Sequence, residues 1–404
     1  MKIFVHDYAG HPFQIDLSRE LARRGHSVVH AYAGNLLTPR GSFESTDGTL
    51  SDLKFVEVPM SEDYRANKYK FLNRRKFERN YGKSLVRIIL EEKPDVVISG
   101  NTPTEPQLAA LLACRKMGIA FIPWIQDFYC EAVGKIVGKK LPIVGGFIYR
   151  WYRFLEGLIL KKCQGIVLIS EDFLPILNEF VTNTNNISVI PNWGALESIS
   201  LTDKRNDWGV KQGLSDRFVF MYTGTLAMKH NPELLLGIAN KFSCRDDVRL
   251  VVVSEGPGAD WLKSEKASRG LNNVLVLPFQ AFEEMASVLG TGDVLIAVLE
   301  EDAGVFSVPS KVLNYLCAGR GLIAAMPQEN LASRIIKRSG AGFSVCPGDI
   351  KGFVELAERM WNDRKLRDEC GAAARLYAEN TFRIEDIAIA FEKVLVGAVE
   401  EGKA

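Results

Sequence analysis

Short apolar runs recur along this chain, and the spacing between neighbouring runs leaves room for one helix. The first three runs are KIFVHD (2–7), SVVHAYA (27–33) and LKFVEV (53–58). Between the first two, Phe13, Leu17 and Leu21 are spaced four residues apart, which is the repeat of one face of a helix. Strands that are apolar throughout are buried on both faces and belong to parallel sheets covered by helices. The pattern therefore predicts an α/β fold.

The polar, turn-rich stretch 196–216 interrupts this alternation near the middle of the chain. A length of 404 residues suits about two domains. The later apolar runs are DVVISG (95–100), IAFIPWI (119–125), GIVLIS (165–170), SVIPNW (188–193), FVFMYTG (218–224), VRLVVVS (248–254), VLVLPF (274–279), DVLIAV (293–298), GLIAA (321–325) and GFSVC (342–346). We expect a Rossmann-like domain at 1–195, a linker at 196–216, a second Rossmann-like domain at 217–376, and a helical segment at 377–404 that crosses back to the first domain.

Composition narrows the class of protein. The formal net charge of +1 argues against a protein that binds nucleic acid over its whole surface. The seven cysteines are scattered without a C-x-x-C pair, which favours a reducing cytoplasm over a disulfide framework or a zinc site. The first residues turn polar too soon for a signal peptide, and no apolar run reaches the roughly 20 residues that span a bilayer. We expect a cytoplasmic protein without a metal site.

The stretch VPSKVLNYLCAGRGLIAA (308–325) has the pattern of an anion-binding unit. A Pro-Ser-Lys turn opens a helix, whose first N–H groups are free to bind an anion beside Lys311. MYTGTLAMKHNPELLL (221–236) is a second stretch of this kind and contains Lys229. Two phosphate-binding helix starts in one half of the chain indicate a diphosphate ligand, and so a nucleotide sugar.

Five segments carry a family likeness: LARRGHSV (21–28), VIPNW (189–193), YTGTLAMKHN (222–231), SEGPG (254–258) and the 308–325 stretch. In this order they resemble the GT-B glycosyltransferases, specifically the retaining family 4 enzymes of cell-surface polysaccharide assembly. The resemblance covers nearly the whole chain. It implies two Rossmann-like domains whose parallel sheets face a central cleft. It also implies transfer of a sugar, UDP-linked sugars being favoured, to a lipid-linked glycan with retention, without a cofactor because the nucleotide sugar is the substrate.

The chain departs from the family pattern at several functional positions. The two glutamates of the usual E-x7-E signature fall on Phe306 and Asn314, and the arginine often found after the first donor-domain strand falls on Thr225. The frequent His-Asp pair of the first domain is Gln126-Asp127. The usual ribose contact and one phosphate clamp therefore need other residues.

The donor side is expected to depend on Lys229 and Lys311. A departing nucleoside diphosphate gains negative charge, which preorganised ammonium and N–H groups stabilise. The plain alternative is that both lysines are solvated surface residues. Ser310 either caps the helix that follows or bonds a phosphate oxygen. Asn314 either replaces a glutamate at the ribose or is a polar residue on a half-buried helix.

Further donor-site candidates lie at the ends of predicted strands, where ligands of open α/β sheets bind. These candidates are Gly10, Gly224, Thr225, Gly256, Gln280 and Gly304. Glycines allow a ligand to approach the backbone, but they are also ordinary turn residues. Gln280 would face the nucleobase. The acidic residues before Gly304, beginning at Glu300, either reach the sugar hydroxyls or form a solvated loop.

On the acceptor side, Asp127 and His11 are the candidates for chemistry. Asp127 would hold the acceptor hydroxyl or orient the transferred sugar, and its alternative role is a helix N-cap. His11 lies in the first loop and faces the same cleft or is incidental. A retaining transfer needs no dedicated base if the leaving phosphate takes the proton, as the resemblance implies. An inverting transfer would need a base such as one of these two residues.

Two basic and aromatic stretches, residues 65–87 and 139–162, indicate a membrane-facing acceptor side. Cations interleaved with aromatic rings suit an anionic bilayer. The alternatives are a solvated basic helix for the first stretch and an aromatic core helix for the second. Nucleic acid also binds such surfaces, but the chain has no recognised motif for it. We expect a peripheral protein on the inner face of the cell membrane.

Two other functions compete with sugar transfer. Nucleotide-sugar 2-epimerases share the double-Rossmann shape but need no lipid acceptor. A catalytically weak glycosyltransferase homologue that acts as an assembly partner would be consistent with the missing glutamates. A NAD dehydrogenase is disfavoured because no G-x-G-x-x-G follows the first strand.

Overall fold

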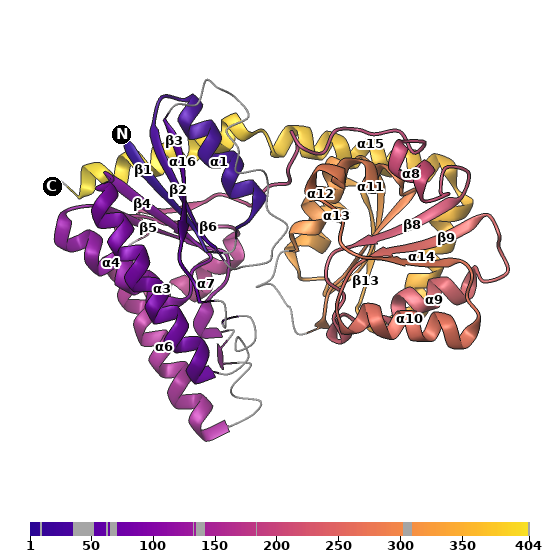
Figure 1. Cartoon of the computed structure of the whole chain (residues 1–404), viewed down its shortest axis with the longest axis horizontal. Coiled ribbons are helices and arrows are strands. Elements are labelled where there is room, and N and C mark those ends of the chain that lie inside the picture. The colour runs from indigo at the N-terminus through magenta and orange to yellow at the C-terminus, as the bar shows by residue number, and fades with distance from the viewer. Residues whose placement is uncertain are drawn as a thin grey trace. The chain divides into compact units, whose positions relative to one another are not determined.

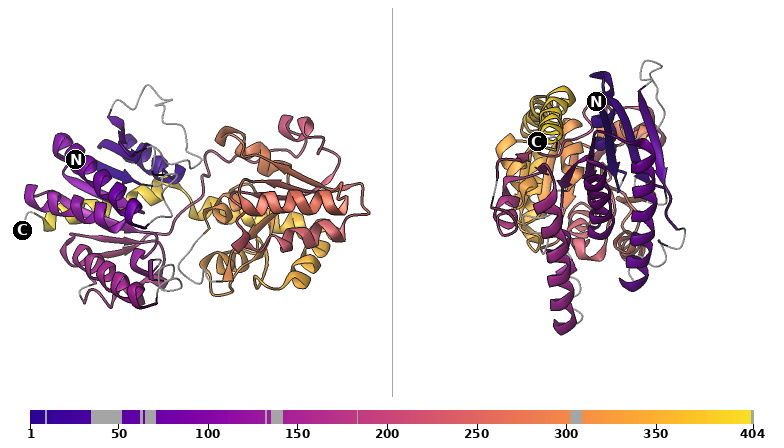
Figure 2. Two further views of the ribbon diagram at one scale, coloured as in Figure 1. Left: turned by 60° about the horizontal axis from the view of Figure 1, so that its bottom comes forward. Right: turned by 90° about the vertical axis from the view of Figure 1, so that its left-hand side faces the viewer.

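The computed structural model describes residues 1–402 except 9, 35–51, 62–63, 65–70, 132, 135–141, 183 and 302–308. The chain divides into two compact units. The first unit combines residues 1–192 with residues 384–404, and the second contains residues 193–383. Each unit is a parallel sheet between helices (Figures 1 and 2), so the predicted α/β class with two Rossmann-like domains is confirmed.

The first unit contains a parallel sheet of seven strands in the order β3-β2-β1-β4-β5-β6-β7. The strands are β1 (Lys2–Asp7), β2 (Ser27–Ala33), β3 (Leu53–Val58), β4 (Val96–Gly100), β5 (Ala120–Ile125), β6 (Ile166–Leu168) and β7 (Ile187–Val189). The strand order reverses between β1 and β4, and ligands of open α/β sheets bind beyond the carboxyl ends of the strands at such a point.

Helices cover both faces of this sheet (Figure 1). Its main helices are α1 (Pro12–Arg23), α3 (Phe71–Glu92), α4 (Thr104–Met117), α6 (Pro142–Lys162) and α16 (Ile384–Glu401). The helix α1 packs beside α16, while α4 packs between α3 and α6. A short connection after β6 contains η1 (Glu171–Phe173) and α7 (Leu174–Leu177).

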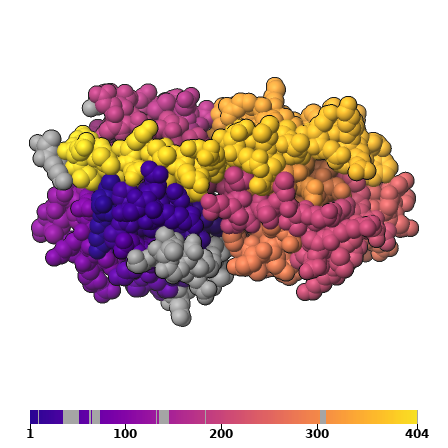
Figure 3. Space-filling model, turned by 90° about the horizontal axis from the view of Figure 1, so that it is seen from above, coloured from indigo at the N-terminus to yellow at the C-terminus, as the bar shows by residue number. Residues whose placement is uncertain are grey.

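The last helix, α16, completes the first unit although it follows the whole second unit in sequence. Phe391 on α16 packs edge to face against Trp124 of β5, with ring centroids 4.8 Å apart. Glu392 accepts hydrogen bonds from Arg24 at 2.6 Å and from His26 at 2.7 Å. Figure 3 shows α16 in yellow against the indigo N-terminal segment. The helix thus contributes both apolar and ionic contacts to the first unit.

The second unit contains six parallel strands in the order β10-β9-β8-β11-β12-β13. The strands are β8 (Phe218–Thr223), β9 (Val248–Val253), β10 (Val274–Leu277), β11 (Val294–Val298), β12 (Gly321–Ala325) and β13 (Gly342–Val345). The order reverses between β8 and β11. The sequence therefore repeats in the second unit the topological feature that creates a binding edge in the first.

Helices flank the sheet of the second unit (Figure 1). They are α8 (Asp207–Lys211), α9 (Glu233–Lys241), α10 (Pro257–Arg269), α11 (Met285–Thr291), α12 (Ser310–Cys317), α13 (Leu331–Ser339), α14 (Ile350–Asn362) and α15 (Arg364–Thr381), with the 3-10 turns η2 (Met228–His230) and η3 (Phe282–Glu284). The helix α9 packs on α14, and α12 packs on α15. Phe220, Leu250 and Phe353 belong to the apolar core of this unit.

Residues 196–216, which we interpreted as a linker, lie in the second unit. They contain α8, whose Asn206 cap accepts a hydrogen bond from the N–H of Gly209 at 3.0 Å. Trp208 on this helix is 4% exposed. The stretch that resembles a linker therefore includes a short capped helix anchored by one buried indole.

Candidate functional site

At the carboxyl edge of the second sheet, Lys311 lies beneath the turn that follows β8. Its Nζ donates a hydrogen bond to the Tyr222 hydroxyl at 2.9 Å and lies 4.1 Å from the centre of that ring. Gly224 turns the chain above it with φ of 103°, and a Cβ at Gly224 would lie 3.2 Å from the Lys311 Nζ. A larger residue at position 224 would therefore crowd the ammonium group.

The surroundings of Lys311 are electrostatically incomplete. In the described part of the chain, no carboxylate forms an ion pair with its ammonium group. Burial among protein atoms lowers the pKa of Lys311 to about 7. A bound anion would raise that pKa again, because an opposite charge favours the protonated form. The site is therefore suited to bind phosphate.

Lys229 has a different environment, because its side chain is exposed and paired. Its Nζ donates to Glu300 at 2.5 Å, beyond the end of β11. His230 faces the same carboxylate, with its Nε2 3.4 Å from Oε2. The hydrogen bond from His230, followed by that from Lys229, lowers the pKa of Glu300 to about 2. Glu300 thus forms an ion pair with one predicted donor-site lysine.

Gly256 and Gly258, which follow β9, pack against the backbone of Leu226. Gly256 has φ of 118°, and a Cβ there would lie 3.2 Å from the Leu226 carbonyl oxygen. The N–H of Gly258 donates to the same oxygen at 2.9 Å. These residues therefore hold the loop that contains Thr225, whose carbonyl oxygen also accepts a hydrogen bond from Tyr222 at 2.9 Å. The Thr225 side chain is exposed.

Three residues that we expected to contact the donor or cap its helix are placed differently in the structure. Pro309 occupies the N-cap of α12 without a side-chain bond, so the proposed cap at Ser310 is wrong. Ser310 already lies in the helix, where a side chain does not reach the free N–H groups as a cap residue does. Asn314 accepts the Ala195 N–H at 3.1 Å, and Gln280 accepts the Trp208 indole N–H at 3.0 Å. Gly304 and Phe306 lie outside the described residues.

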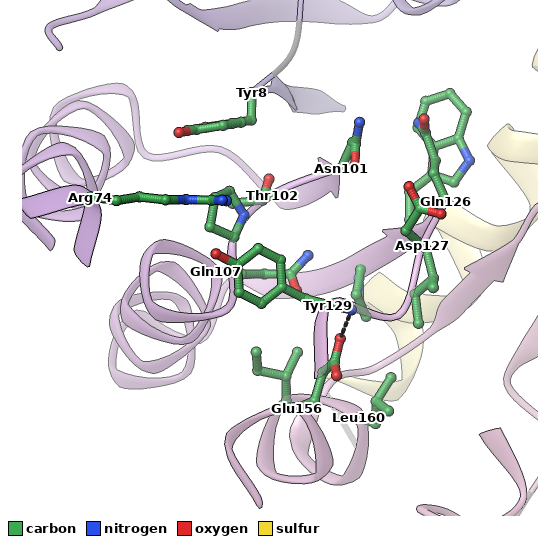
Figure 4. Close-up of a pocket in the computed structure, with 15 residues that line it drawn as sticks. Tyr8, Arg74, Asn101, Thr102, Gln107, Gln126, Asp127, Tyr129, Glu156 and Leu160 are labelled. Carbon is green, nitrogen blue, oxygen red and sulfur yellow. Dashed lines mark hydrogen bonds between the residues drawn. The ribbon is translucent and has the colours of Figure 1, made fainter. Parts of the chain in front are cut away.

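The first unit contains a pocket of about 310 Å³ at the carboxyl ends of β1, β4 and β5 (Figure 4). Its polar lining includes Tyr8, Asn101 and Gln107, and its apolar lining includes Trp124 and Leu160. The pocket lies at the point where the strand order of this sheet reverses. It is therefore the candidate ligand site of the first unit.

Asp127 lines this pocket beside Gln126 (Figure 4). The Asp127 side chain reaches solvent, yet the protein packed around its carboxyl group raises its pKa to about 7. Glu156 takes the alternative role of helix cap that we considered for Asp127. It accepts the N–H groups of Tyr129 and Cys130 at 2.8 and 3.0 Å. Asp127 is therefore available to a ligand in the pocket.

The sequence interpretation missed Arg74 as part of this pocket. We assigned it to a membrane-facing stretch, but its Nε donates to the buried Glu78 at 2.7 Å, and its guanidinium lies 5.5 Å from the centre of the Tyr129 ring. The neighbouring Arg75 pairs with Glu105 at 2.7 Å. Two cations of the 65–87 stretch are thus paired with carboxylates of the unit, although their side chains remain 33% and 37% exposed. The helical spacing from Arg74 to Glu78 was the signal that could have identified the pair.

Gly10 and His11 lie between β1 and α1. The Gly10 N–H donates to Asp7 Oδ1 at 2.8 Å, and its φ of 72° favours glycine. The His11 Nε2 is 3.4 Å from the Asn101 amide nitrogen, so the residue borders the pocket wall. Burial lowers the pKa of His11 to about 4, which leaves the ring neutral at pH 7. His11 can therefore accept or donate a hydrogen bond without charge.

The described residues contain neither a helix that could span a membrane nor a cluster of possible metal ligands. No helix in the described ranges is both long enough and apolar enough to cross a membrane. Among the same residues, no three His, Cys, Asp or Glu side chains converge on a possible metal position.

Comparison with known proteins assigns both halves of the chain. Residues 14–193 match the family described as glycosyl transferase 4-like domain, and residues 204–377 match glycosyl transferases group 1. WcaI of Escherichia coli, named for colanic acid biosynthesis and glycosyl transfer, is 23% identical over 73% of this chain and 72% of its own length. CapM of Staphylococcus aureus, named as a capsular polysaccharide biosynthesis glycosyltransferase, is 24% identical over 74% of this chain and 77% of its own.

The fold also matches solved structures. The structure of HepE from Anabaena in complex with UDP-glucose superposes with a TM-score of 0.71, covering 98% of this chain and 99% of that one at 13% identity. Taken with the two family matches, which together span most of the sequence, this likeness confirms the expected fold. The chain belongs to the GT-B glycosyltransferases, with a family 4-like first domain and a group 1 second domain.

Proposed function

We propose that this protein transfers a sugar from a nucleotide diphosphate sugar, with UDP favoured as the nucleotide, to a lipid-linked glycan in the assembly of a cell-surface polysaccharide. The environment of Lys311 carries the proposal. An ammonium group packed among protein atoms beside the β8 turn, with no carboxylate partner among the described residues, is suited to a diphosphate. The solved complex of HepE with UDP-glucose supports a UDP-linked donor.

The departing diphosphate would gain charge beside Lys311 during transfer. An ammonium group that is already held by Tyr222 needs little rearrangement to stabilise that charge. Lys229 would assist by exchanging Glu300 for a phosphate oxygen, since its side chain is 64% exposed and can move. Because these cations supply the charge stabilisation, we expect turnover to continue in the presence of EDTA.

The acceptor would occupy the pocket of the first unit. Its hydroxyl groups match the uncharged polar side chains of Tyr8, Asn101 and Gln107, and Asp127 would accept a hydrogen bond from one of them. The names of WcaI and CapM support a role in surface polysaccharide assembly. We place the acceptor on a lipid at the inner face of the membrane, where a peripheral enzyme would meet it.

Retention is proposed for the stereochemistry. The leaving phosphate would take the acceptor proton, so that Asp127 and His11 position groups rather than remove the proton. NMR of the glycosidic product tests this step, because a product with inverted configuration would assign a base to one of these residues.

The activity is tested by incubating the purified protein with labelled UDP-sugars and a membrane lipid extract. Release of UDP together with label in the lipid fraction is expected. Isomerisation of the sugar without transfer would make the protein an epimerase. No consumption of any donor with any extract would support a catalytically weak assembly partner.

Donor binding has an independent readout. UDP bound beside Lys311 should raise the pKa of that lysine from about 7, so binding should take up protons at neutral pH. Calorimetric titration in buffers with different ionisation enthalpies measures this uptake. Lys311→Ala should abolish the uptake, whereas Lys365→Ala, which removes an exposed lysine on α15, should leave it unchanged.

A further inference from the structure

One face of α6 exposes large aromatic side chains to solvent. Phe147 is 73% exposed, Trp151 47% and Phe154 57%. The spacing of four and then three residues places the three rings on one side of the helix. Trp151 and Phe154 also lie near each other, with ring centroids 6.2 Å apart. We call Phe147, Trp151 and Phe154 the aromatic ridge.

The ridge is distinct from the side of α6 that forms the core of the unit. Tyr152, Leu155 and Ile159 on the other side are at most 5% exposed. The sequence alternative of an aromatic core helix therefore describes half of this helix. Three large rings exposed on one face of a single helix are more than the scattered apolar residues of an ordinary surface, and they indicate an interaction site.

The exposed charged residues of α6 itself have one sign. Arg150 and Lys161 lie on the same face and are exposed, and Lys162 follows at the helix end. The single acidic residue of α6, Glu156, is buried and accepts the backbone N–H groups of Tyr129 and Cys130. The exposed face of α6 thus combines aromatic rings with cations and contains no carboxylate.

A shallow groove of about 320 Å³ runs along this face. Its lining includes Arg150, Lys161, Phe154 and Phe180. Arg153 and Glu179 also line it, and they pair with each other. No ion pair involves Arg150 or Lys161 within the described part of the chain. Both cations therefore remain available to an external phosphate beside an apolar wall.

We propose that this face of α6 is the surface by which the protein binds an anionic bilayer, with the ridge among the lipid headgroups and the cations on lipid phosphates. Aromatic rings with flanking cations are the composition of interfacial helices, and Trp favours the headgroup region. The inference takes from the proposed function only the location of the acceptor. Binding to the bilayer requires no sugar transfer.

Charge complementarity favours a bilayer over a second copy of the chain. A symmetric contact through this face would bring the cations of two copies together, because the same patch meets itself in such a dimer. The carboxylate that lines the groove, Glu179, already pairs with Arg153, and α6 itself exposes no carboxylate, so the cations would stay uncompensated. An anionic lipid surface supplies the missing negative charge, and a fluid bilayer accommodates a projecting helix.

Flotation with vesicles tests the proposal. The full-length protein should float with equal parts of phosphatidylglycerol and phosphatidylcholine, and salt should weaken the binding. Replacing both Phe147→Ser and Phe154→Ser should weaken binding by about tenfold or more, because the apolar contact with the interface is lost. The matched control is Val210→Ser with Leu376→Ser, two similarly exposed apolar residues at 60% and 59% in the second unit.

A second pair of variants separates charge from apolar contact. Arg150→Gln with Lys161→Gln should weaken binding to anionic vesicles about fivefold for each cation and reduce its salt dependence. Lys351→Gln with Lys365→Gln, exposed on α14 and α15, is the control of equal charge and should bind as the unaltered protein does. Binding to pure phosphatidylcholine should be weak for all of these proteins.

Unchanged flotation of the Phe147→Ser and Phe154→Ser variant would overturn the proposal. So would a dimer in solution that this variant dissociates, because the ridge would then be an interface between copies. Loss of sugar transfer in a protein that still floats would contradict the proposed function alone. Conversely, transfer to a detergent-dispersed acceptor without any flotation would contradict only the membrane surface.

Discussion

The two units present the same edge of the same kind of sheet, but they treat charge in opposite ways. The second unit pairs Lys229 with Glu300, whose pKa is lowered, and leaves Lys311 without a carboxylate partner among the described residues. In the first unit, the surroundings shift Asp127 to a pKa of about 7 and His11 to about 4, which favours their neutral forms. One edge is suited to a charged phosphate and the other to sugar hydroxyl groups. A shared topology thus fixes where a ligand binds, while local burial decides which chemistry it meets.

Substitution of Lys311 is the strongest test of the difference between the two sheet edges. Lys311→Ala should lower kcat/KM by about 10²- to 10³-fold, the usual effect of removing one preorganised group that stabilises transition-state charge. Lys229→Ala should have a smaller effect, because that side chain is 64% exposed and already paired. Steady-state assays with the identified donor measure both. Equal kcat/KM values for Lys311→Ala and the unaltered protein would remove the phosphate role from this edge.

The two units also differ in how freely the atoms packed against a glycine can move. A Cβ at Gly194 would lie 2.5 Å from the Leu313 carbonyl oxygen of α12, and backbone atoms there cannot move freely. Gly194→Ala should therefore destabilise the protein by about 2 kcal/mol in urea unfolding. The counterpart Gly100→Ala in the first unit meets the side-chain oxygen of Gln14 at 2.8 Å, and the end of a side chain shifts more readily than backbone. A larger loss for Gly100→Ala would reverse the assigned difference in rigidity.

The sign of pH dependence should differ between the edges. Glu300 has its pKa lowered from 4.5 to about 2, so its contribution is present above the unfolded pKa and is lost as pH falls toward about 2. Glu300→Gln should cost about 1 kcal/mol at neutral pH, a small value because Lys229 is exposed to solvent. Urea unfolding at a series of pH values measures the difference, which should shrink in acid. A constant difference would show that the loss does not arise from ionisation.

Asp127 should give the smallest effect, with the opposite sign. Its pKa is raised from 3.8 to about 7, so the folded protein binds the proton more tightly and loses stability as pH rises through this range. Asp127→Asn should remove that trend, by less than about 1 kcal/mol because solvent reaches the carboxyl group. Activity that needs the carboxylate should fall below about pH 7 in the unaltered protein. Identical pH profiles for protein and variant would separate Asp127 from the acceptor.

Much of the fold could be predicted because burial on both faces of a parallel sheet leaves an unbroken apolar signal. The runs 2–7, 27–33 and 53–58 coincide with β1, β2 and β3. SVIPNW was the poorest match, since only Ile187–Val189 forms a strand. That segment instead continues into Gly194, which packs against α12. Apolar composition identified the segment as buried but could not distinguish a strand from a packed loop.

The site was less predictable because its side chains have partners distant in sequence. Lys311 and the turn at Gly224 were identified from helix-start patterns. Tyr222 accepts the hydrogen bond from the lysine, but the sequence indicated only that it belongs to a buried strand. Asn314 and Gln280 were expected at the ligand, yet Ala195 and Trp208 use their amide groups. A sequence shows that an amide is present, whereas only the fold shows which neighbour has already used it.

The return of α16 to the first unit has a consequence for synthesis of the protein. A chain emerges from the ribosome in order, and domains generally begin to fold as they appear. The contacts that α16 makes with Trp124, Arg24 and His26 cannot form until Phe391 and Glu392 have been translated. The second unit can close earlier, because all of its strands precede residue 346. The domain whose strands are made first is therefore completed after the second sheet, and a nascent chain exposes the α1 surface until α16 has emerged.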